Sequence, residues 1–565
     1  MKTKNLIWHI FKKDCGLLWP FILGAAGLQF ITMALRYALD HVAWQNVQAL
    51  LNLYNLLLIA TIAAPPLLIA TAVHQDAVPG VRQDWLVRPV KRRDLLLAKL
   101  LFLLLMVQGP ILLADMMQAM ANGFPLIPSL GAAASRNLYL LLGLSLPVFA
   151  FASLTRNMAE TVIGAVAGLL GFGVLQILIN NRGQVGPLRG TGLFWIAESS
   201  MFAIALLGSI VVLAMQYFRR KTMLARGAMA GVAFLFLLAY MVPWNFAFAL
   251  EQRLSPSPGA GSSIVMTFNP SMIRFRLPDG MSRSAVAATL PGRATRDEAS
   301  TVYLPLQIAG LPADGALNTD NSELVLRDAD NTVIYRGPAD DLVVRKDGPA
   351  EPAHFTVGIR RSAFFRDIGP EDTPVPESNG GQALVYQGVA LPRSLYDRIK
   401  NRPLRLEINY SLTLLRATSY NIPALNADLR IPNVGHCRSR MDDEADDIVV
   451  NCIQAGAAST DCNSAFLEHA PSGRRNPARF YCWPNYSPYF GQYLPDAMTR
   501  NRASFPFRDL SGLAKYPVDA SQLPDARVVL RVYEAQDHFT RQLVIPRIQL
   551  SDWESLEHTQ VAENR

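Results

Sequence analysis

The chain has 565 residues, of which 50% are hydrophobic and 17% are charged, and its net charge is +8. At roughly 100–200 residues per domain, this length excludes a single ordinary domain. Residues 1–250 hold 19 Lys and Arg against 8 Asp and Glu, whereas residues 251–565 hold 34 against 37. Because the basic residues of the first part stand in short clusters between apolar stretches, they indicate a lipid bilayer as the partner and no nucleic acid.

The first 250 residues predict an α-helical, polytopic membrane domain. A spanning helix needs about 20 mostly apolar residues. We expect no cleavable signal peptide, because the first apolar run is too long and no small-residue cleavage site follows it. Residues 1–15 place several apolar side chains on one helical face, which predicts an amphipathic interface helix on the cytoplasmic membrane surface. The domain then covers residues 16–250, with seven expected spans at residues 16–39, 48–73, 95–121, 137–154, 158–180, 198–218 and 227–250.

The distribution of Lys and Arg predicts the orientation of these spans. The segments before the first span and after the second, fourth and sixth spans hold 15 Lys and Arg, and the alternate segments hold four. The positive-inside rule therefore places the N-terminus of this multi-pass inner-membrane protein in the cytoplasm. Seven spans leave the chain after Leu250 in the periplasm.

The remaining residues predict an all-β extracytoplasmic domain. Residues 251–262 are rich in Pro, Gly and Ser, which indicates a linker. Beyond them apolar residues alternate with a period of two, most clearly from Leu404 to Leu414. Short alternating strands between turn residues favour an antiparallel β-sandwich. We expect two lobes, at residues 263–370 and 380–560, and one short helix at residues 393–401.

The cysteines agree with an extracytoplasmic second half. Four of the five cysteines fall within 46 residues: Cys437, Cys452, Cys462 and Cys482. An even cluster in a non-cytosolic domain predicts two disulfides, with three possible connectivities. The alternatives are a zinc site and free thiols. A zinc site is disfavoured because no Cys-x-x-Cys pair is present, so we expect no metal.

The segment after the second expected span carries a resemblance. Residues 85–100 read WLVRPVKRRDLLLAKL, and residues 152–157 form a tight turn between the fourth and fifth spans. Together with the interface helix, this layout resembles the permease subunits of type-2 ABC transporters, the export-type family, over residues 1–226. The additional span and the large C-terminal domain depart from that family.

The resemblance implies a separate ATP-binding cassette ATPase as partner, and a homodimer or a second permease. It implies that the ATPase contacts the interface helix and the loop, through Arg82, Asp84, Trp85, Arg88, Lys91, Arg92 and Arg93. The chain has no Gly-x-x-x-x-Gly-Lys-Ser/Thr phosphate loop, and it lacks His-Glu-x-x-His and Gly-x-Ser-x-Gly. We therefore expect no enzyme activity and no cofactor, with the energy for transport supplied by the partner.

Two further features are candidate sites. Asp115, inside the third expected span, is either a residue of the transport pathway or solvated near the interface. The aromatic, Pro-rich segment 481–507 either binds a sugar or protein partner or caps the sandwich. Its candidate binding residues are Trp483, Tyr486, Tyr489 and Phe490.

These observations leave two principal functions open. The first is the permease subunit of an ABC-type exporter whose periplasmic β domain receives cargo or docks an envelope partner. The alternative is a non-transport membrane anchor that presents a periplasmic sensing, adhesion or assembly module. A membrane-bound enzyme is a third and weaker hypothesis, because the catalytic motifs above are missing.

Overall fold

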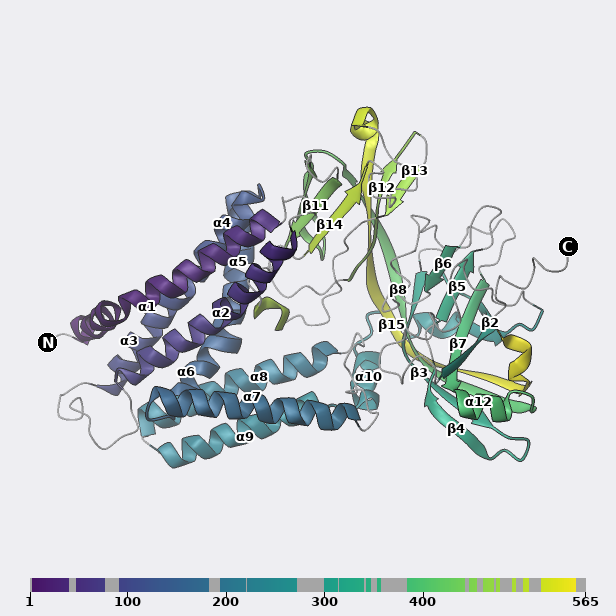
Figure 1. The fold of residues 1–565 in the computed structure, drawn as a ribbon, viewed down its shortest axis with the longest axis horizontal. Helices are drawn as coiled ribbons and strands as arrows, with labels where there is room; N and C mark the ends of the chain where they lie inside the picture. Colours follow the sequence, from purple (N-terminus) through teal and green to yellow (C-terminus); the bar gives the residue numbers. More distant parts are fainter. Residues whose placement is uncertain are drawn as a thin grey trace. The chain divides into compact units, whose positions relative to one another are not determined.

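A computed structural model of the chain divides into two compact units (Figure 1). The first, here the helical unit, comprises Met1–Trp244, Ile422–Thr460 and Arg479–Arg508, and the rest of the chain is the β unit. The structure describes residues 3–39, 47–76, 91–181, 194–219, 221–271, 299–312, 315–339, 342–346, 353–356, 384–442, 447–454, 461–471, 474–477, 490–493, 501–507 and 520–554.

Long apolar helices make up most of the helical unit. They are α1 (Thr3–Leu39), α2 (Val47–His74), α3 (Arg92–Phe102), α4 (Gly109–Ala121), α5 (Leu126–Leu140), α6 (Leu146–Ala152), α7 (Met158–Asn181), α8 (Phe194–Ala214) and α9 (Thr222–Tyr240). The π-helical segments η3 (Leu103–Gln108) and η4 (Leu141–Ser145) join α3 to α4 and α5 to α6, and η5 (Met215–Arg219) extends α8.

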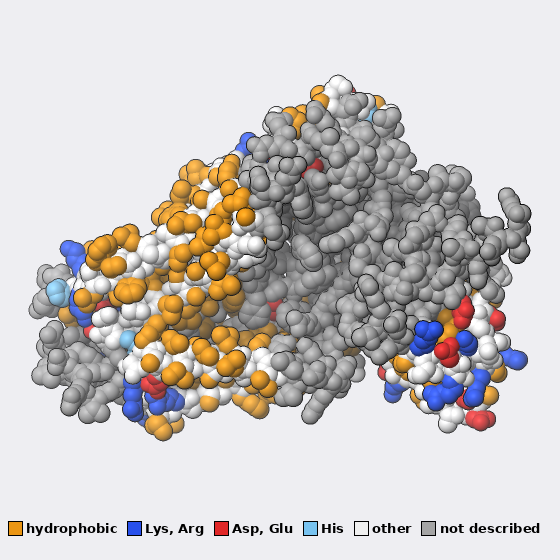
Figure 2. All heavy atoms as spheres, in the orientation of Figure 1, with side chains coloured by type: hydrophobic (Ala, Val, Ile, Leu, Met, Phe, Trp, Pro, Cys, Tyr) orange, Lys and Arg blue, Asp and Glu red, His pale blue; other side chains and the backbone are white. Residues whose placement is uncertain are grey.

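Six helices in the described part of the chain are long and apolar enough to cross a membrane. They are Leu6–Leu39, Ala49–His74, Arg92–Ala121, Leu126–Ala152, Trp195–Arg219 and Thr222–Tyr240. Figure 2 shows apolar side chains over much of the surface of the helices. Leu56, Ile59 and Leu169 are among the exposed large apolar residues of these helices. Apolar surface of this extent is stable in lipid and not in water. The chain is thus a multi-pass membrane protein, as the sequence predicts.

One of the expected spans differs from the structure. Residues 158–180 correspond to α7, a continuous helix of 24 residues. The span expected at 227–250 is interrupted, because α9 ends at Tyr240 and α10 (Trp244–Arg253) begins a new helix. Pro243 lies in this break, where it lacks an N–H donor and disfavours helical geometry in the preceding residue.

The expected interface helix is not a separate element. A single helix, α1, runs from Thr3 through the first span to Leu39 without a break. Its apolar face is as predicted, but Ile10 and Phe11 are buried in a core with residues of α2 and α3, including Val73 and Leu95. The face therefore packs on the neighbouring helices.

A four-stranded antiparallel sheet also belongs to the helical unit. Its strands are β9 (Asp428–Ile431), β10 (Gly435–Asp442), β11 (Asp447–Ile453) and β14 (Asn501–Pro506), in the order β14-β11-β10-β9. Ile453 shares a small core with Ala119, Phe124 and Ala132, so the sheet covers the turn between α4 and α5. The helix Arg92–Ala121 has 30 residues and is about 45 Å long, so the sheet is remote from the start of α3. We call the turn between α4 and α5 the sheet end, and the start of α3 the basic end.

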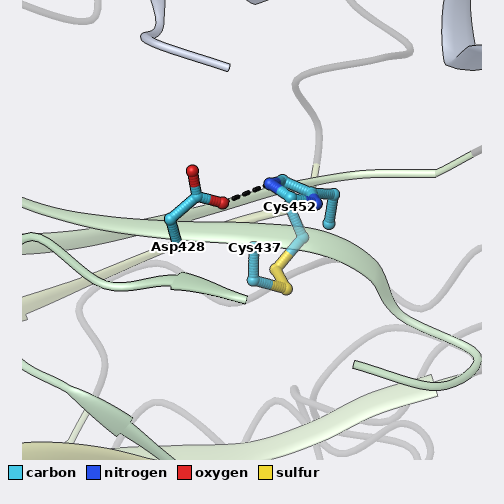
Figure 3. Close-up of a disulfide and its surroundings, with 4 residues drawn as sticks. Asp428, Cys437 and Cys452 are labelled. Carbon is cyan, nitrogen blue, oxygen red and sulfur yellow. Dashed lines mark ion pairs between the residues drawn. A yellow bond between two sulfur atoms is a disulfide. The ribbon is translucent and has the colours of Figure 1, made fainter. Parts of the chain in front are cut away.

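One predicted disulfide is present in this sheet. Cys437 of β10 and Cys452 of β11 are direct cross-strand partners and are bonded to each other (Figure 3). Cys482 lies outside the described residues, and Cys462 lies in a strand without a described side chain. The second expected disulfide therefore stays a prediction.

The β unit contains two antiparallel sheets. Its strands are β1 (Val265–Phe268), β2 (Ala299–Ala309), β3 (Gly315–Arg327), β4 (Val333–Pro338), β5 (Leu342–Lys346), β6 (Ala353–Thr356), β7 (Leu384–Pro392), β8 (Leu404–Pro423), β12 (Asp461–His469), β13 (Arg474–Pro477) and β15 (Ala526–Ile548). The sheet orders are β1-β2-β7-β5-β6 and β13-β12-β15-β8-β3-β4. Leu304 of β2, Val389 of β7 and Leu406 of β8 belong to one core, which joins the two sheets.

The expected division of this region into two lobes is wrong. Strand β2 pairs with β7, and β3 pairs with β8, so each sheet contains strands from both expected lobes. In contrast, the alternation from Leu404 to Leu414 is confirmed, because the apolar members of β8 form a buried face. The short helix is also present, as α12 (Arg393–Ile399).

The expected linker at 251–262 is ordered against β15. The Gly261 N–H donates to Asp537 Oδ2 at 2.9 Å, and the Arg541 guanidinium donates to the Gly261 carbonyl at 2.6 Å. Glu251, in α10, forms an ion pair of 3.1 Å with His538 Nε2. These contacts fix the start of the β unit to one strand. The Pro and Gly residues of this segment therefore form tight turns and do not make a flexible linker.

His538 is a titratable group at the centre of these contacts. Its Nδ1 lies 2.7 Å from Thr413 Oγ1. Burial opposes its protonation, but the hydrogen bond and charge of Glu251, with smaller contributions from Asp320 and Asp537, outweigh it and raise the pKa of His538. Because the pKa of His538 is higher in the folded than in the unfolded state, its protonation stabilises the fold. This contribution is complete below the unfolded pKa, about 6.5, and is lost as the pH rises through the folded pKa.

We therefore predict that the melting temperature of the full-length protein in detergent falls as the pH rises from 6 to 9. His538→Gln removes the titrating group and should flatten this dependence, as should Glu251→Gln, which removes the charge that raises the pKa. The measurement is thermal unfolding at a series of pH values. Equal slopes in the wild type and both variants would contradict the assignment.

Candidate functional site

Lys99 forms a buried ionic cluster at the basic end. Its Nζ donates to Asp14 Oδ2 at 2.8 Å, to the Ala72 carbonyl at 2.7 Å and to Asp76 Oδ2 at 2.8 Å. A Lys ammonium has three N–H donors, and all three are used. The Lys99 side chain is 2% exposed and that of Asp14 is 0% exposed. One ammonium group thus joins α1, the end of α2 and α3.

The charges of the cluster are balanced. Lys13 of α1 forms a second ion pair with Asp76, at 2.7 Å, so two ammonium groups face two carboxylates. Burial opposes ionisation of Asp76, but the charge of Lys99 and the hydrogen bonds from Lys13 and Lys99 outweigh it and lower the pKa of that carboxyl. Asp76 therefore stays ionised at neutral pH.

Two residues of the cluster flank the loop in which the sequence places the ATPase contacts. Asp76 lies just before this loop, and Lys99 lies two turns after Arg92, where α3 begins. Of the expected contact residues, Lys91 and Arg93 are exposed and Arg92 is half-buried. Arg82, Asp84, Trp85 and Arg88 lie outside the described residues.

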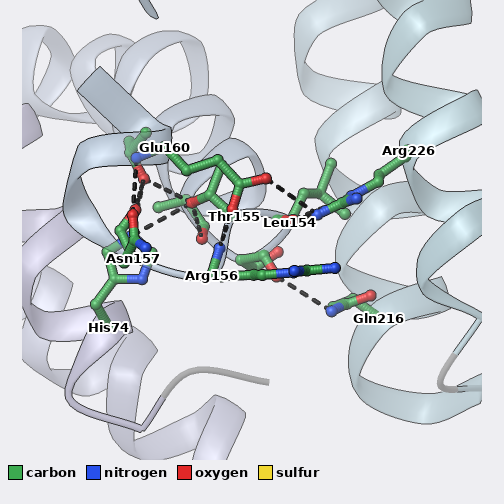
Figure 4. A network of polar contacts seen from close by, with 11 residues as sticks. His74, Leu154, Thr155, Arg156, Asn157, Glu160, Gln216 and Arg226 are labelled. Atoms are coloured by element: carbon green, nitrogen blue, oxygen red, sulfur yellow. Dashed lines mark hydrogen bonds and ion pairs between the residues drawn. The ribbon is translucent and has the colours of Figure 1, made fainter. Parts of the chain in front are cut away.

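The turn between α6 and α7 is held by a second polar network (Figure 4). Asn157 Oδ1 accepts from the Glu160 N–H at 2.9 Å, and Glu160 Oε2 accepts from the Arg156 N–H at 2.7 Å, which caps the start of α7. Arg226 of α9 donates to the Leu154 carbonyl at 2.9 Å and pairs with Glu160 at 3.2 Å. The turn is thus fixed to α9 as well as to its own helix.

The two networks meet at the end of α2. His74 Nε2 lies 2.8 Å from Thr161 Oγ1 and 3.3 Å from Thr155 Oγ1, and the two hydroxyls are 2.6 Å apart. Gln216, in η5, donates to the Ser153 carbonyl at 3.1 Å. His74 and Asp76 belong to the same short segment, so side-chain contacts connect α1, α2, α3, the α6–α7 turn, η5 and α9. We call this set of contacts the polar layer.

Asp115 lies in a different cluster, toward the sheet end. It is buried and forms an ion pair with Arg136 of α5, which also donates from Nε to the Gln492 carbonyl at 3.0 Å. Asp115 is therefore not solvated near an interface. The signal for this pairing in the sequence is the presence of opposite charges in two consecutive apolar helices, because a buried charge in lipid requires a partner.

The candidate binding aromatics are mostly outside the described residues. This holds for Trp483, Tyr486 and Tyr489, while Phe490 begins the short helix η8 (Phe490–Tyr493) without a described side chain. Gln492 and Tyr493, which sequence reasoning did not select, contact the helices instead. Among the described residues, no group of His, Cys, Asp and Glu is arranged to hold a metal ion.

We predict that Lys99→Met destabilises the helical unit by roughly 3–5 kcal/mol, because it leaves the buried Asp14 carboxylate without its cation and removes one of the two cations that face Asp76. Adding Asp14→Asn should recover part of the loss, because it removes one uncompensated charge. Thermal unfolding in detergent measures both effects. The matched control is Lys91→Met, which removes an exposed ammonium and should change stability by no more than about 0.5 kcal/mol. An equal effect of Lys91→Met would contradict the role of burial.

Comparisons of the chain with family models, curated protein sequences and solved structures found no match. Its function therefore has to be inferred from the residues described above.

Proposed function

We propose that the chain is the membrane-spanning permease subunit of an ABC-type exporter and works with a separate ATPase. The observation that carries this proposal is the Lys99 cluster. It ties both ends of the loop that resembles an ATPase-binding segment to α1. The second support is the resemblance of residues 1–226 to type-2 ABC permeases, which implies that this loop contacts the ATPase.

The cluster gives the loop a mechanical connection to the helices. Residues 77–91 begin directly after Asp76 and end before Arg92, and Lys99 pairs with Asp76 across this segment. Because Lys99 also pairs with Asp14, displacement of the loop is transmitted to α1, α2 and α3 together. A partner that binds one arrangement of these helices more tightly shifts their equilibrium by its difference in affinity.

Electrostatics supports a protein partner at the basic end. Lys91 and Arg93 are exposed beside the loop, and Lys12 is exposed on α1. These cations stand close to balanced, buried ion pairs, so their own charge is not neutralised by the cluster. An acidic patch on an ATPase would be attracted and oriented by them.

The proposed orientation has the basic end in the cytoplasm and the sheet end in the periplasm, in an inner membrane. Its support is that the four-stranded sheet packs on the turn between α4 and α5, at the end of the helices opposite Lys99. The Cys437–Cys452 disulfide in that sheet fits an oxidising compartment. In this arrangement the periplasmic strands receive cargo or dock an envelope partner, and a second copy or second permease completes the transporter.

A membrane anchor for a periplasmic module is the second candidate. Complete pairing of the three Lys99 donors favours it, because a fully satisfied buried cluster also suits a bundle that does not move. In that case the Lys99 cluster would serve only rigidity, and no ATPase would associate with the loop.

Copurification separates the two functions. We predict that the intact chain, extracted from its native membrane in mild detergent, retains an ATP-binding cassette ATPase. Charge reversal of Arg88, Lys91, Arg92 and Arg93 to Glu should reduce the retained ATPase at least tenfold, because like charges would then face the acidic partner. Mass spectrometry of the eluted proteins measures the ratio.

The matched control reverses Arg336 and Arg393, whose side chains are 67% and 66% exposed in the β unit. It should leave the ATPase ratio unchanged. Melting temperature and gel filtration verify that the loop variant remains folded. Absence of any ATPase from the wild-type eluate would reject the permease proposal and favour the anchor.

A further inference from the structure

A strip of buried polar residues runs along the contact between two helices toward the sheet end. One helix contributes positions 108, 115, 118 and 122, whose spacings of 7, 3 and 4 place them on one face. The other contributes positions 129, 136 and 145. The seven residues are Gln108, Asp115, Gln118, Asn122, Ser129, Arg136 and Ser145, and all are buried. We call this strip the polar seam.

Two π-helical segments meet at the deep end of the seam. Gln108 of η3 donates from Nε2 to Ser145 Oγ of η4 at 2.7 Å. The Gln108 backbone carbonyl accepts from Asn137 Nδ2 at 2.9 Å. Gln108 Oε1 is buried and has no hydrogen-bond partner among the described residues. Short π-helical segments recur at functional sites, and an unsatisfied buried acceptor calls for a functional explanation.

The helix η8 enters the helical bundle beside this seam. The Gln492 carbonyl accepts from Arg136, as described above. A methyl group at Gly143 would overlap the Tyr493 hydroxyl and would lie 2.6 Å from the Phe202 ring. Glycine at position 143 therefore makes room for Tyr493 between η4 and α8.

The environment of Tyr493 keeps its hydroxyl protonated. Burial, with a smaller contribution from the nearby charge of Glu198, raises the pKa of Tyr493 to about 12. A neutral phenol can occupy an apolar gap between helices and leave it again, whereas a phenolate would require a cation. Tyr493 is thus suited to reversible insertion.

We propose that Phe490–Tyr493 is a plug that covers the polar seam beside Arg136 and Gly143, and that it withdraws to let a polar solute reach Gln108 and Ser145. This inference rests on the proposed transport function. The plug stands eight residues before β14 (Asn501–Pro506), which pairs with β11 in the four-stranded sheet. The plug is therefore close in sequence to a strand of that sheet.

Withdrawal of the plug leaves the ion pair of the seam intact. Arg136 keeps its ion pair with Asp115 when it loses the Gln492 carbonyl. The freed Nε–H then faces the vacated space, where a carbonyl, carboxylate or phosphate oxygen of a solute would replace the backbone acceptor. The geometry thus favours a solute that carries a hydrogen-bond acceptor.

Access to position 145 tests the plug. The reporter is Ser145→Cys in a Cys15→Ser background of the full-length chain in lipid nanodiscs, treated with a small, water-soluble thiol reagent. Mass spectrometry of the peptide that contains residue 145 gives the modification rate. With the plug in place we expect slow modification. Tyr493→Ala, which empties the gap, and Gly143→Ala, which displaces the phenol, should each raise the rate at least tenfold.

Two controls make the outcome decisive. Gly131→Ala adds the same methyl group on α5 where no atom lies within 4 Å, and it should leave the rate unchanged. A second reporter, Ser209→Cys at a buried position of α8, should stay protected in every variant. An unchanged rate at residue 145 in Tyr493→Ala would overturn the plug, and so would a parallel rise at residue 209, which indicates general loosening. Neither readout requires an ATPase, so failure of the plug and failure of the permease proposal remain distinguishable.

Discussion

The packing of the helical unit depends on the positions of the acceptors of one buried ammonium group, that of Lys99. The Lys99 side chain is buried, and burial of its charge is unfavourable unless other groups compensate it. Its acceptors come from α1 and from the end of α2, at Asp14, Asp76 and the Ala72 carbonyl. The requirement for compensation therefore fixes three helices at one point. The amphipathic start of α1 is held against α2 and α3 for the same reason, because Asp14 is part of that helix.

The sheet end follows the same rule with a different consequence. Asp115 and Arg136 compensate each other inside one helical hairpin, so this pair does not need a third helix. Arg136 retains an N–H donor that is directed to the Gln492 carbonyl, from a segment more than 350 residues later in the chain. The basic end is thus closed by charges within the helices, whereas the sheet end is completed by a backbone group from outside them. Such a difference suits a bundle in which one end transmits force and the other end opens.

Local patterns in the sequence predict the elements, and non-local contacts decide how they assemble. The apolar runs predict the membrane helices, and the alternation from Leu404 to Leu414 predicts the buried face of β8, because both depend on periodicity alone. The two-lobed division fails because the pairing of β2 with β7 leaves no local signal. At the site, the sequence reveals the basic motif that ends near Lys99. It does not reveal Asp14 and Asp76 as the partners of Lys99, since they are 85 and 23 residues away. The linker expected at 251–262 has the composition of a flexible segment, and its order comes from contacts with Asp537 and Arg541.

The way in which the chain alternates between the two units has a consequence for biosynthesis. The chain passes from one unit to the other five times, and about 180 residues separate Trp244 from Ile422, where the helical unit resumes. At roughly 5–20 residues per second, a ribosome needs on the order of 10–40 s to produce that interval. Throughout this delay the nascent helices are already made, while the apolar surface around Phe124 and the Arg136 donor still await residues that have not been translated. A newly made membrane half is therefore an incomplete folding unit, and its maturation is set by the synthesis of distant strands.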